Sequence, residues 1–257
     1  MLSVAMNFPD PIAGPRARLD RAKVHLDLLV GLVGDFLNHD PYTTTTRRDD
    51  ERRRYIFEVH IRDSPPDLLP FIASDFIHNA RAALDNIVWA LAPASVRRRN
   101  PSFPLYDDPI RFQCDALPML KGMKRNVIDA IEWCQPYHGD GHFVASERLL
   151  HLNHLWNFDK HRAPLAVGCV ADMASLAIRH GDGDFPHLRV HMGTVLEEGK
   201  EIAWLPFDPA LTTEPHPHFH FGMAFVGAGN RPIPYYGLMK MYDLITSEVV
   251  PAIQAAL

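Results

Sequence analysis

The sequence lacks the features that define several large classes of protein. It has 257 residues but only three cysteines, Cys114, Cys134 and Cys169, without the spacing of a zinc site or a disulfide framework. The N-terminus has neither the basic segment nor the long apolar stretch of a secretory signal. The longest apolar run, residues 26–37, is interrupted by two glycines and two aspartates and is too short to cross a bilayer. These absences predict a cytoplasmic protein.

An excess of positive charge is also missing. The formal net charge of −5 argues against a broadly cationic nucleic-acid-binding surface. Arginines do cluster in residues 47–54, but they flank three acidic residues, and we interpret this segment as a solvated charged turn. Walker-type loops, Rossmann glycine patterns, nucleophile motifs and internal repeats are absent as well. The common catalytic signatures therefore do not identify a function.

The hydrophobic pattern that is present predicts an α+β protein. Apolar residues recur at helical spacing in about five segments, which we expect to form a helical bundle. These segments are residues 15–37, 64–92, 117–135, 145–161 and 235–257. We expect Ser64 to cap the second helix and Pro93 to end it.

Strands are expected mainly before the last helix. Short β-type segments separated by turn signals predict an antiparallel meander packed with the bundle. The segments are residues 165–173, 175–180, 188–195, 201–205 and 218–226. Residues 54–62 form a further strand that could join this sheet, whereas residues 43–50 are expected to form a polar loop. We expect one α+β domain over residues 1–257, helical in about 14–162 and 235–257 and mainly β in about 163–230.

The helix over residues 71–92 has polar residues that are unusual for a solvent face. It contains no Lys or Glu, and its apolar and polar residues separate cleanly at about 100° per residue. The polar face carries Asp75, His78, Asn79, Arg81, Asp85, Asn86 and Trp89. Arg81 and Asp85 are four residues apart and can pair, and either Asp75 or Asp85 could orient the ring of His78. The alternative is an exposed face with an ordinary surface ion pair.

The helix over residues 145–161 carries leucines and aromatic residues in nearly every direction, which predicts burial. Its polar stripe must then find partners, because an unsatisfied buried polar group costs about 1–3 kcal/mol. We expect this stripe to face the polar face of helix 71–92. The candidate catalytic residues are His161, His154, Asp85, His78 and Arg148, and the candidate ligand-binding residues are Arg81, Asn79, Asn153, Asn157 and Arg162.

Several roles fit such a site. A histidine held by a carboxylate could act as an acid or base, with Arg81 or Arg162 stabilising an oxyanion or phosphate. The stripes could instead recognise an anionic ligand, or form a purely structural network. Zinc could be bound by His78, His154 and His161 with Asp85, but their spacing is not that of a strong site, and we assign no metal and no cofactor. His216, His218 and His220 would share one face of a strand, and the prolines beside them favour a surface cluster.

Two motifs lie at the centre of these helices, His78-Asn79-x-Arg81-x-x-x-Asp85 and Asn157-x-Asp159-Lys160-His161-Arg162. With Phe103-Pro104 and Gln135-Pro136-Tyr137, they resemble those of a widespread group of uncharacterised bacterial proteins. The resemblance covers roughly residues 55–165 and implies a bacterial origin, but the group has no established activity.

The spacing of Arg148 and His154, with five residues between them, is similar to the Arg–His motif of the HEPN superfamily. Many of these helical domains are metal-independent ribonucleases of toxin–antitoxin and phage-defence systems. The resemblance implies that Arg148 binds phosphate and that His154 transfers protons for 2′-hydroxyl attack on RNA, across a homodimer. Leu149 departs from the motif, which usually has a polar residue after the arginine.

Overall fold

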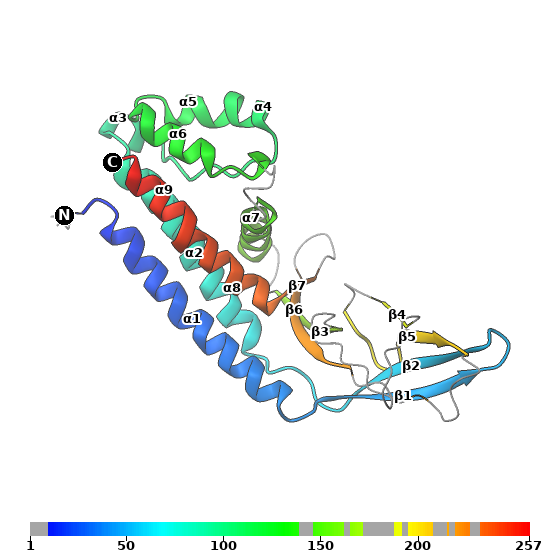
Figure 1. Ribbon diagram of the computed structural model, residues 1–257. Coiled ribbons are helices and arrows are strands. Elements are labelled where there is room, and N and C mark those ends of the chain that lie inside the picture. The colour runs from blue at the N-terminus through cyan, green and yellow to red at the C-terminus, as the bar shows by residue number, and fades with distance from the viewer. Residues whose placement is uncertain are drawn as a thin grey trace. The chain divides into compact units, whose positions relative to one another are not determined.

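The protein is an α+β protein, as the hydrophobic pattern predicts, with helices and two antiparallel sheets (Figure 1). The computed structural model describes residues 10–138, 146–161, 165–171, 188–191, 195–207, 215, 219–226 and 232–257. The chain divides into two compact units. Unit 1 comprises Met1–Leu28, Phe71–Pro164 and Tyr236–Leu257, and unit 2 comprises Leu29–Pro70 and Leu165–Tyr235. The single domain expected over residues 1–257 stays a prediction.

The longest helices follow the predicted segments closely. They are α1 (Ala13–Leu37), α2 (Leu69–Leu91), α7 (Ser146–His161), and α8 (Tyr235–Leu244), which continues through a π-helical turn (Ile245–Val249) into α9 (Val250–Ala255). Shorter ones are α3 (Ala94–Arg97), α4 (Pro109–Arg111), a π-helical segment (Phe112–Ala116), α5 (Leu117–Leu120), α6 (Arg125–Trp133) and a 3-10 turn (Pro136–His138). With contiguous segments merged and the 3-10 turn left aside, the described residues form seven helices, more than the expected five or so.

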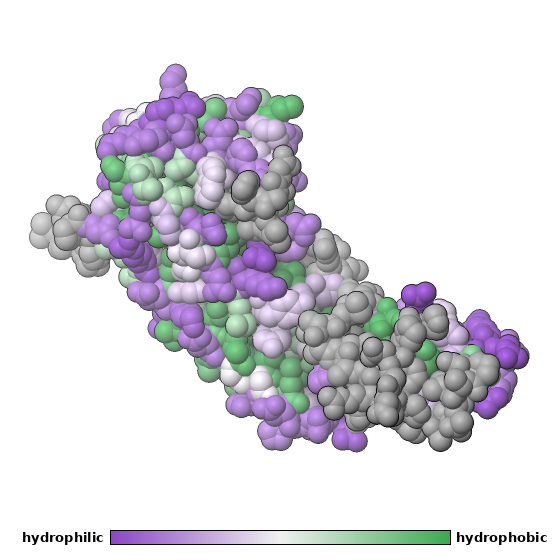
Figure 2. All heavy atoms as spheres, in the orientation of Figure 1, coloured by the Kyte–Doolittle hydropathy of each residue, from purple (hydrophilic) through white to green (hydrophobic). Residues whose placement is uncertain are grey.

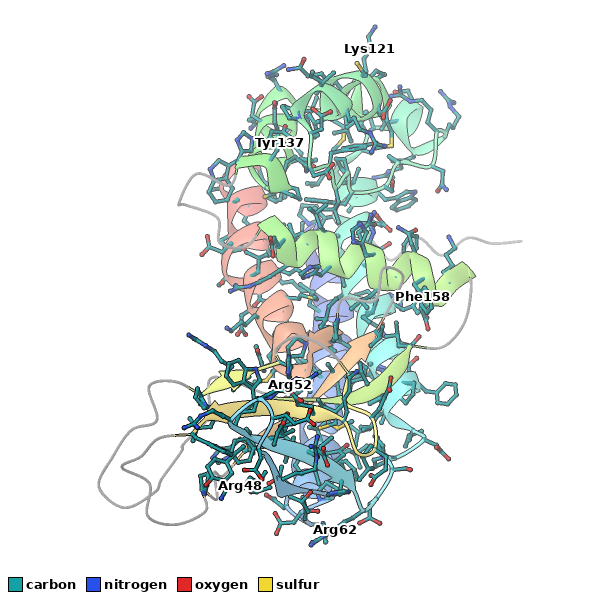
Figure 3. All side chains as sticks on the ribbon, turned by 90° about the vertical axis from the view of Figure 1, so that its right-hand side faces the viewer. Arg48, Arg52, Arg62, Lys121, Tyr137 and Phe158 are labelled. Atoms are coloured by element: carbon teal, nitrogen blue, oxygen red, sulfur yellow. The ribbon has the colours of Figure 1, made fainter. Side chains whose placement is uncertain are left out.

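Within unit 1, α1 and α2 lie side by side (Figures 1 and 3). His25 of α1 faces Asp75 of α2 at 3.7 Å, and Arg18 donates to the Asn79 side chain at 3.3 Å. The predicted apolar face of α2 is confirmed, since residues such as Phe76, Leu84 and Ile87 are completely buried. These contacts turn the polar face of α2 partly towards α1.

The start of α2 differs from the prediction. The helix begins at Leu69, so Ser64 is not its N-cap. Ser64 and Pro65 each precede a proline, and a residue before proline is sterically disfavoured in the helical region. The paired prolines therefore delay the helix instead of forming its first turn.

The helix expected over residues 117–135 is interrupted. α5 ends at Leu120, and α6 begins only at Arg125. Between them Gly122 has a φ of 110°, which a residue with a side chain rarely adopts. Lys121 points outwards from this break (Figure 3). The glycine lets the chain turn where the apolar spacing alone predicts a continuous helix.

In unit 2, one sheet has the order β1-β2-β5-β4. Its strands are β1 (Tyr42–Asp49), β2 (Arg54–Ile61), β5 (Glu201–Pro206) and β4 (Arg189–Val190), and neighbours are antiparallel. The strand expected at residues 54–62 does pair with the strand expected at residues 201–205. The polar loop expected at residues 43–50 is wrong, because it forms β1, where four consecutive threonines suit a strand. Hydrophilic residues cover the tip of the β1–β2 hairpin (Figure 2).

A second sheet has the order β3-β6-β7. Its strands are β3 (Ala166–Ala171), β6 (Phe221–Val226) and β7 (Pro232–Pro234). The single meander is therefore wrong, because β5 pairs with β2 from early in the chain instead of joining β3 and β6. Both sheets contribute to one core cluster, which includes Phe57, Cys169 and Ile202. The strand expected at residues 175–180, with His216 and His218, lies outside the described residues, and His220 is exposed.

Candidate functional site

Arg81 of α2 is the most unusual charged residue of unit 1. It is only 5% exposed, although charged side chains are rarely buried unless they are paired. Its Nη2 donates to the carbonyl of Phe103 at 2.8 Å, and its Nη1 lies 3.1 Å from Asp85. The Asp85 contact has the distance of an ion pair without the geometry of a hydrogen bond, so Nε and Nη1 of Arg81 have no acceptor. The exposed surface pair considered above is therefore wrong.

Asp85 explains part of this arrangement. Its Oδ1 accepts the backbone N–H of Phe103 at 2.8 Å. Arg81 and Asp85, one turn apart on α2, thus hold both the carbonyl and the N–H of one residue. Burial raises the pKa of Asp85, and Arg81 opposes this. Burial also lowers the pKa of Arg81, which still keeps its proton at any pH of interest.

Gln135 holds the next part of the same segment. Its side chain is completely buried, donates to the carbonyl of Pro104 at 2.9 Å and accepts the N–H of Tyr106 at 3.1 Å. The motifs at His78–Asp85, Phe103-Pro104 and Gln135-Pro136-Tyr137 therefore converge on one stretch of backbone, residues 103–106. Side chains of α2 and of Gln135, which follows the end of α6, therefore hold this stretch.

The predicted contact between α2 and α7 is present, although with a different partner. The ring of His78 meets Asp159 of α7, with Nε2 and Oδ2 2.8 Å apart, and Ser74 also donates to Asp159. The expectation that Asp75 or Asp85 orients this ring is wrong, because Asp75 faces α1 and Asp85 faces Phe103. The side chain of Asp159 is 10% exposed, while that of His78 is 43% exposed.

Trp156 is the aromatic centre of the same contact. The Arg81 guanidinium lies 5.5 Å from its ring centre, and the Lys160 ammonium lies 4.5 Å from it. The ring of His78 meets it edge-on at 6.5 Å. A cation over an aromatic face is attracted by the ring quadrupole, by about 0.5–2 kcal/mol depending on exposure. Trp156 thereby offsets part of the cost of burying the Arg81 charge.

α7 is not buried all round. Leu149, Leu152 and Leu155 are buried, but His154 and Asn157 are exposed. The prediction of burial on every side is wrong, because α7 packs through these leucines and through Trp156 and Asp159 but leaves His154 and Asn157 open to solvent. Water can satisfy the exposed side chains of His154 and Asn157.

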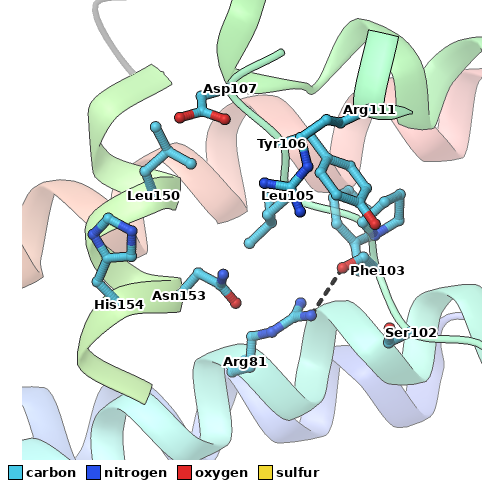
Figure 4. A pocket seen from close by; sticks show the side chains of 11 residues that line it. Arg81, Ser102, Phe103, Leu105, Tyr106, Asp107, Arg111, Leu150, Asn153 and His154 are labelled. Carbon is cyan, nitrogen blue, oxygen red and sulfur yellow. Dashed lines mark hydrogen bonds between the residues drawn. The ribbon is translucent and has the colours of Figure 1, made fainter. Parts of the chain in front are cut away.

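A pocket of about 300 Å³ opens beside Arg81 within unit 1 (Figure 4). α2 contributes Arg81, and α7 contributes Leu150, Asn153 and His154. The remaining lining comes from Ser102, Phe103, Pro104, Leu105, Tyr106, Asp107 and Arg111. Figure 4 shows the side chains of Arg81, Asn153 and Arg111 pointing towards a common space. The pocket therefore brings two guanidinium groups, an amide and an imidazole together.

The other candidate residues lie elsewhere. Asn79 donates to the Asp75 carbonyl of its own helix and accepts from Arg18 of α1, so it is not part of the pocket. Arg148 is half-buried on α7 and does not line the pocket. His161 ends α7 with its side chain outside the described part, and Arg162 lies outside it altogether.

Metal ligation was the third chemistry considered for these residues. In the part of the chain that the structure describes, no group of three or more His, Cys, Asp or Glu side chains could hold a metal ion. The three cysteines are free, and burial raises the pKa of the Cys134 and Cys169 thiols to about 12. No described helix is both long enough and apolar enough to cross a membrane.

Sequence reasoning missed three residues that build this site. Asp159 stands in the Asn-x-Asp-Lys-His-Arg motif, but nothing in the sequence shows that it faces His78. Gln135 stands in the Gln-Pro-Tyr motif, and its amide bonds three backbone groups, the carbonyls of Pro104 and Ile131 and the N–H of Tyr106. Arg111 ends the three-residue helix α4, and no motif or spacing in the sequence marks it as a site residue.

The fold and the site define an α+β protein with a small polar pocket that is lined by a buried arginine. Comparison of the chain with protein-family models, with curated proteins and with solved structures gave no match.

Proposed function

We propose that unit 1 binds a small anionic ligand in the pocket beside Arg81. The observation that carries this proposal is that Arg81 lines the pocket while its Nε and Nη1 are buried without an acceptor. A buried donor without a partner costs about 1–3 kcal/mol, and more when it is charged. An anion in the pocket would lie beside this guanidinium and offset part of the cost of burying its charge.

Asp85 does not act as a hydrogen-bond acceptor for these two nitrogens of Arg81. It is spaced for an ion pair with Arg81, but its Oδ1 already accepts the N–H of Phe103. The residues opposite Arg81 add further donors, since Arg111 and Asn153 point to the same space (Figure 4). A pocket of about 300 Å³ is at the small end of ligand sites, which suits a small molecule.

The test is calorimetric titration of the protein with inorganic phosphate, phenyl phosphate and benzoate at low ionic strength. We expect at least one of these anions to bind, and Arg111→Gln to weaken that binding about tenfold, because it removes a charge-assisted contact. Arg111 is exposed, so this substitution leaves the buried network intact.

Arg125→Gln is the matched control. Arg111 forms an exposed ion pair with Asp115, four residues later, and Arg125 forms an equivalent exposed pair with Asp129. Arg125 does not line the pocket. We expect this variant to bind as the wild type does. The proposal is wrong if no anion binds, or if the two variants weaken binding equally.

A metal-independent ribonuclease is the second candidate. The observation in its favour is that His154 is exposed and lines the same pocket as Arg81 and Arg111, so a proton-transfer group lies near groups that bind phosphate. Arg148, the other residue of the HEPN-like spacing, lies outside the lining. This candidate therefore replaces Arg148 by Arg81 and Arg111 as the phosphate-binding groups.

An RNA-cleavage assay in the presence of a chelator tests this second candidate. We expect cleavage by the wild type, its loss in His154→Ala, and no change in His220→Ala, which removes another exposed histidine. The absence of cleavage by the wild type would exclude this second candidate.

A cytoplasmic location, a bacterial origin and a homodimer stay predictions from the sequence, and no observation favours a metal-dependent hydrolase.

A further inference from the structure

We propose that a cluster of cations at one end of unit 1 binds the phosphate backbone of a nucleic-acid duplex. The cation cluster consists of six exposed side chains from two segments of the chain: Arg97, Arg98, Arg99, Lys121, Lys124 and Arg125. It lies outside the lining of the pocket beside Arg81. The net charge of −5 excludes a broadly cationic surface but not a local one.

The fold brings the two segments of the cluster together. Arg99 donates to the carbonyl of Pro118 at 2.7 Å and to that of Lys121 at 2.5 Å, which ties the end of α3 to the turn after α5. The same turn packs against α3, since a Cβ at Gly122 would lie 3.4 Å from the Val96 side chain. α3, α5 and α6 therefore meet at one end of the helical unit (Figure 1).

Most of the charge in the cluster is not neutralised by carboxylates. Arg97 donates to two carbonyls in the last turn of α2, both at 3.0 Å, and Arg99 donates to the two carbonyls already named. A carbonyl has no net charge, so it fixes a guanidinium and leaves its positive charge available. Between described side chains, Arg125 is the one member of the cluster that forms an ion pair, with Asp129.

The β1–β2 hairpin of unit 2 provides a contrast. It is also rich in arginine, but four of its arginines pair with an Asp or Glu within 4 Å: Arg47, Arg48, Arg52 and Arg54. Their charge is cancelled locally, as expected for a solvated charged turn. The cation cluster of unit 1 therefore matches a polyanion better than the hairpin does.

The surroundings of the cluster favour a duplex over a membrane or a single strand. Within residues 94–100 and 121–126, the other exposed residues are small or polar: Ala94, Ser95, Asn100, Gly122 and Asn126. Trp89, the large aromatic side chain beside them, has the Arg97 guanidinium 4.4 Å from its ring centre. Membrane surfaces are bound through apolar side chains in addition to cations, and single strands through several stacked aromatic rings. The phosphates of a duplex need cations alone, and arginine suits them because its planar fork can donate two hydrogen bonds.

The test is fluorescence anisotropy of a labelled DNA duplex titrated with the whole protein at several salt concentrations. The five cations without an ion pair can neutralise about five phosphates, so the dissociation constant should rise about 500-fold between about 50 and 200 mM salt. The double variant Arg98→Gln/Lys124→Gln should weaken binding about tenfold at low salt. It should also reduce the slope of log affinity against log salt by about two.

Arg21→Gln/Arg62→Gln is the matched control. Arg21 and Arg62 are exposed outside the cluster and form no ion pair with a described side chain, so their replacement removes the same net charge. We expect this variant to bind the duplex as the wild type does. The absence of duplex binding at low salt, or equal weakening in the two double variants, would overturn the proposal.

Two competing probes distinguish the other classes of anionic partner. Vesicles that contain phosphatidylserine stand for an anionic membrane, and polyglutamate stands for an acidic protein. We expect both to bind the wild type at least tenfold more weakly than the duplex does. If either binds as tightly as the duplex, the assignment of the cluster to nucleic acid is overturned.

Discussion

At the scale of single residues, the site depends on a few polar side chains that each serve one backbone segment. Arg81 and Asp85 hold the peptide groups of Phe103, and Gln135 holds those of Pro104 and Tyr106. The presence of unusual polar residues on α2 and α7 was predictable from the sequence, because α2 carries no Lys or Glu and α7 carries a stripe of His and Asn among leucines. Their partners were not predictable, because Phe103 and Gln135 reach them only through the fold.

Asp85→Ala should destabilise the protein by about 3 kcal/mol, because it leaves the buried Arg81 without its counter-charge and the Phe103 N–H without its acceptor. The measurement is the free energy of unfolding in urea. Asp129→Ala is the control, since it removes the same residue type from an exposed pair, where the loss is about 0–1 kcal/mol. Equal losses of unfolding free energy in the two variants would show that the buried contacts of Asp85 stabilise the protein no more than an exposed ion pair does.

At the scale of elements, apolar periodicity predicted the long helices and missed their interruptions. α1, α2 and α7 lie where the spacing places them, because the spacing of a helix is a local property. The break between α5 and α6 and the late start of α2 come instead from single residues, Gly122 and the paired prolines. The strand at β1 was missed because threonine-rich polar sequence also suits a loop.

Substitution of alanine for Gly122 and for Gly31 should change the stability of the protein in opposite directions. Gly122→Ala should destabilise the protein by about 1–3 kcal/mol, because a residue with a side chain is strained at a φ of 110°. Gly31→Ala should stabilise it by about 0.5–1 kcal/mol, since this glycine lies within α1 with nothing within 4 Å of the new Cβ. Thermal and urea unfolding measure both, and a Gly122→Ala variant as stable as the wild type would contradict the strained turn.

At the scale of the whole molecule, the fold class was predictable and the arrangement of strands was not. The counts of helical and β-type segments indicate an α+β protein. The pairing of β2 with β5 joins residues far apart in the sequence, and no local pattern specifies which distant strand a given strand will meet. The division into sheets is therefore a property of the folded chain.

The protein should unfold in a single cooperative transition. α1 is one continuous helix, and the division between the two units falls within it, between Leu28 and Leu29. Unfolding of either unit would therefore disrupt α1, which contributes residues to the other unit as well. Scanning calorimetry should give equal calorimetric and van't Hoff enthalpies. Two resolved transitions would show that the units unfold separately and would contradict a single domain.

The sequence by itself determined the α+β class, the long helices and the two helical faces that carry the candidate site. These depend on the order of neighbouring residues, which the periodicity of apolar side chains records directly. Only the tertiary structure decided that Arg81 is buried, that Asp159 meets His78, and that Arg111 and Asn153 point into the same pocket. Burial and hydrogen-bond partners depend on packing between segments that are distant in the chain, and that packing leaves no local trace in the sequence.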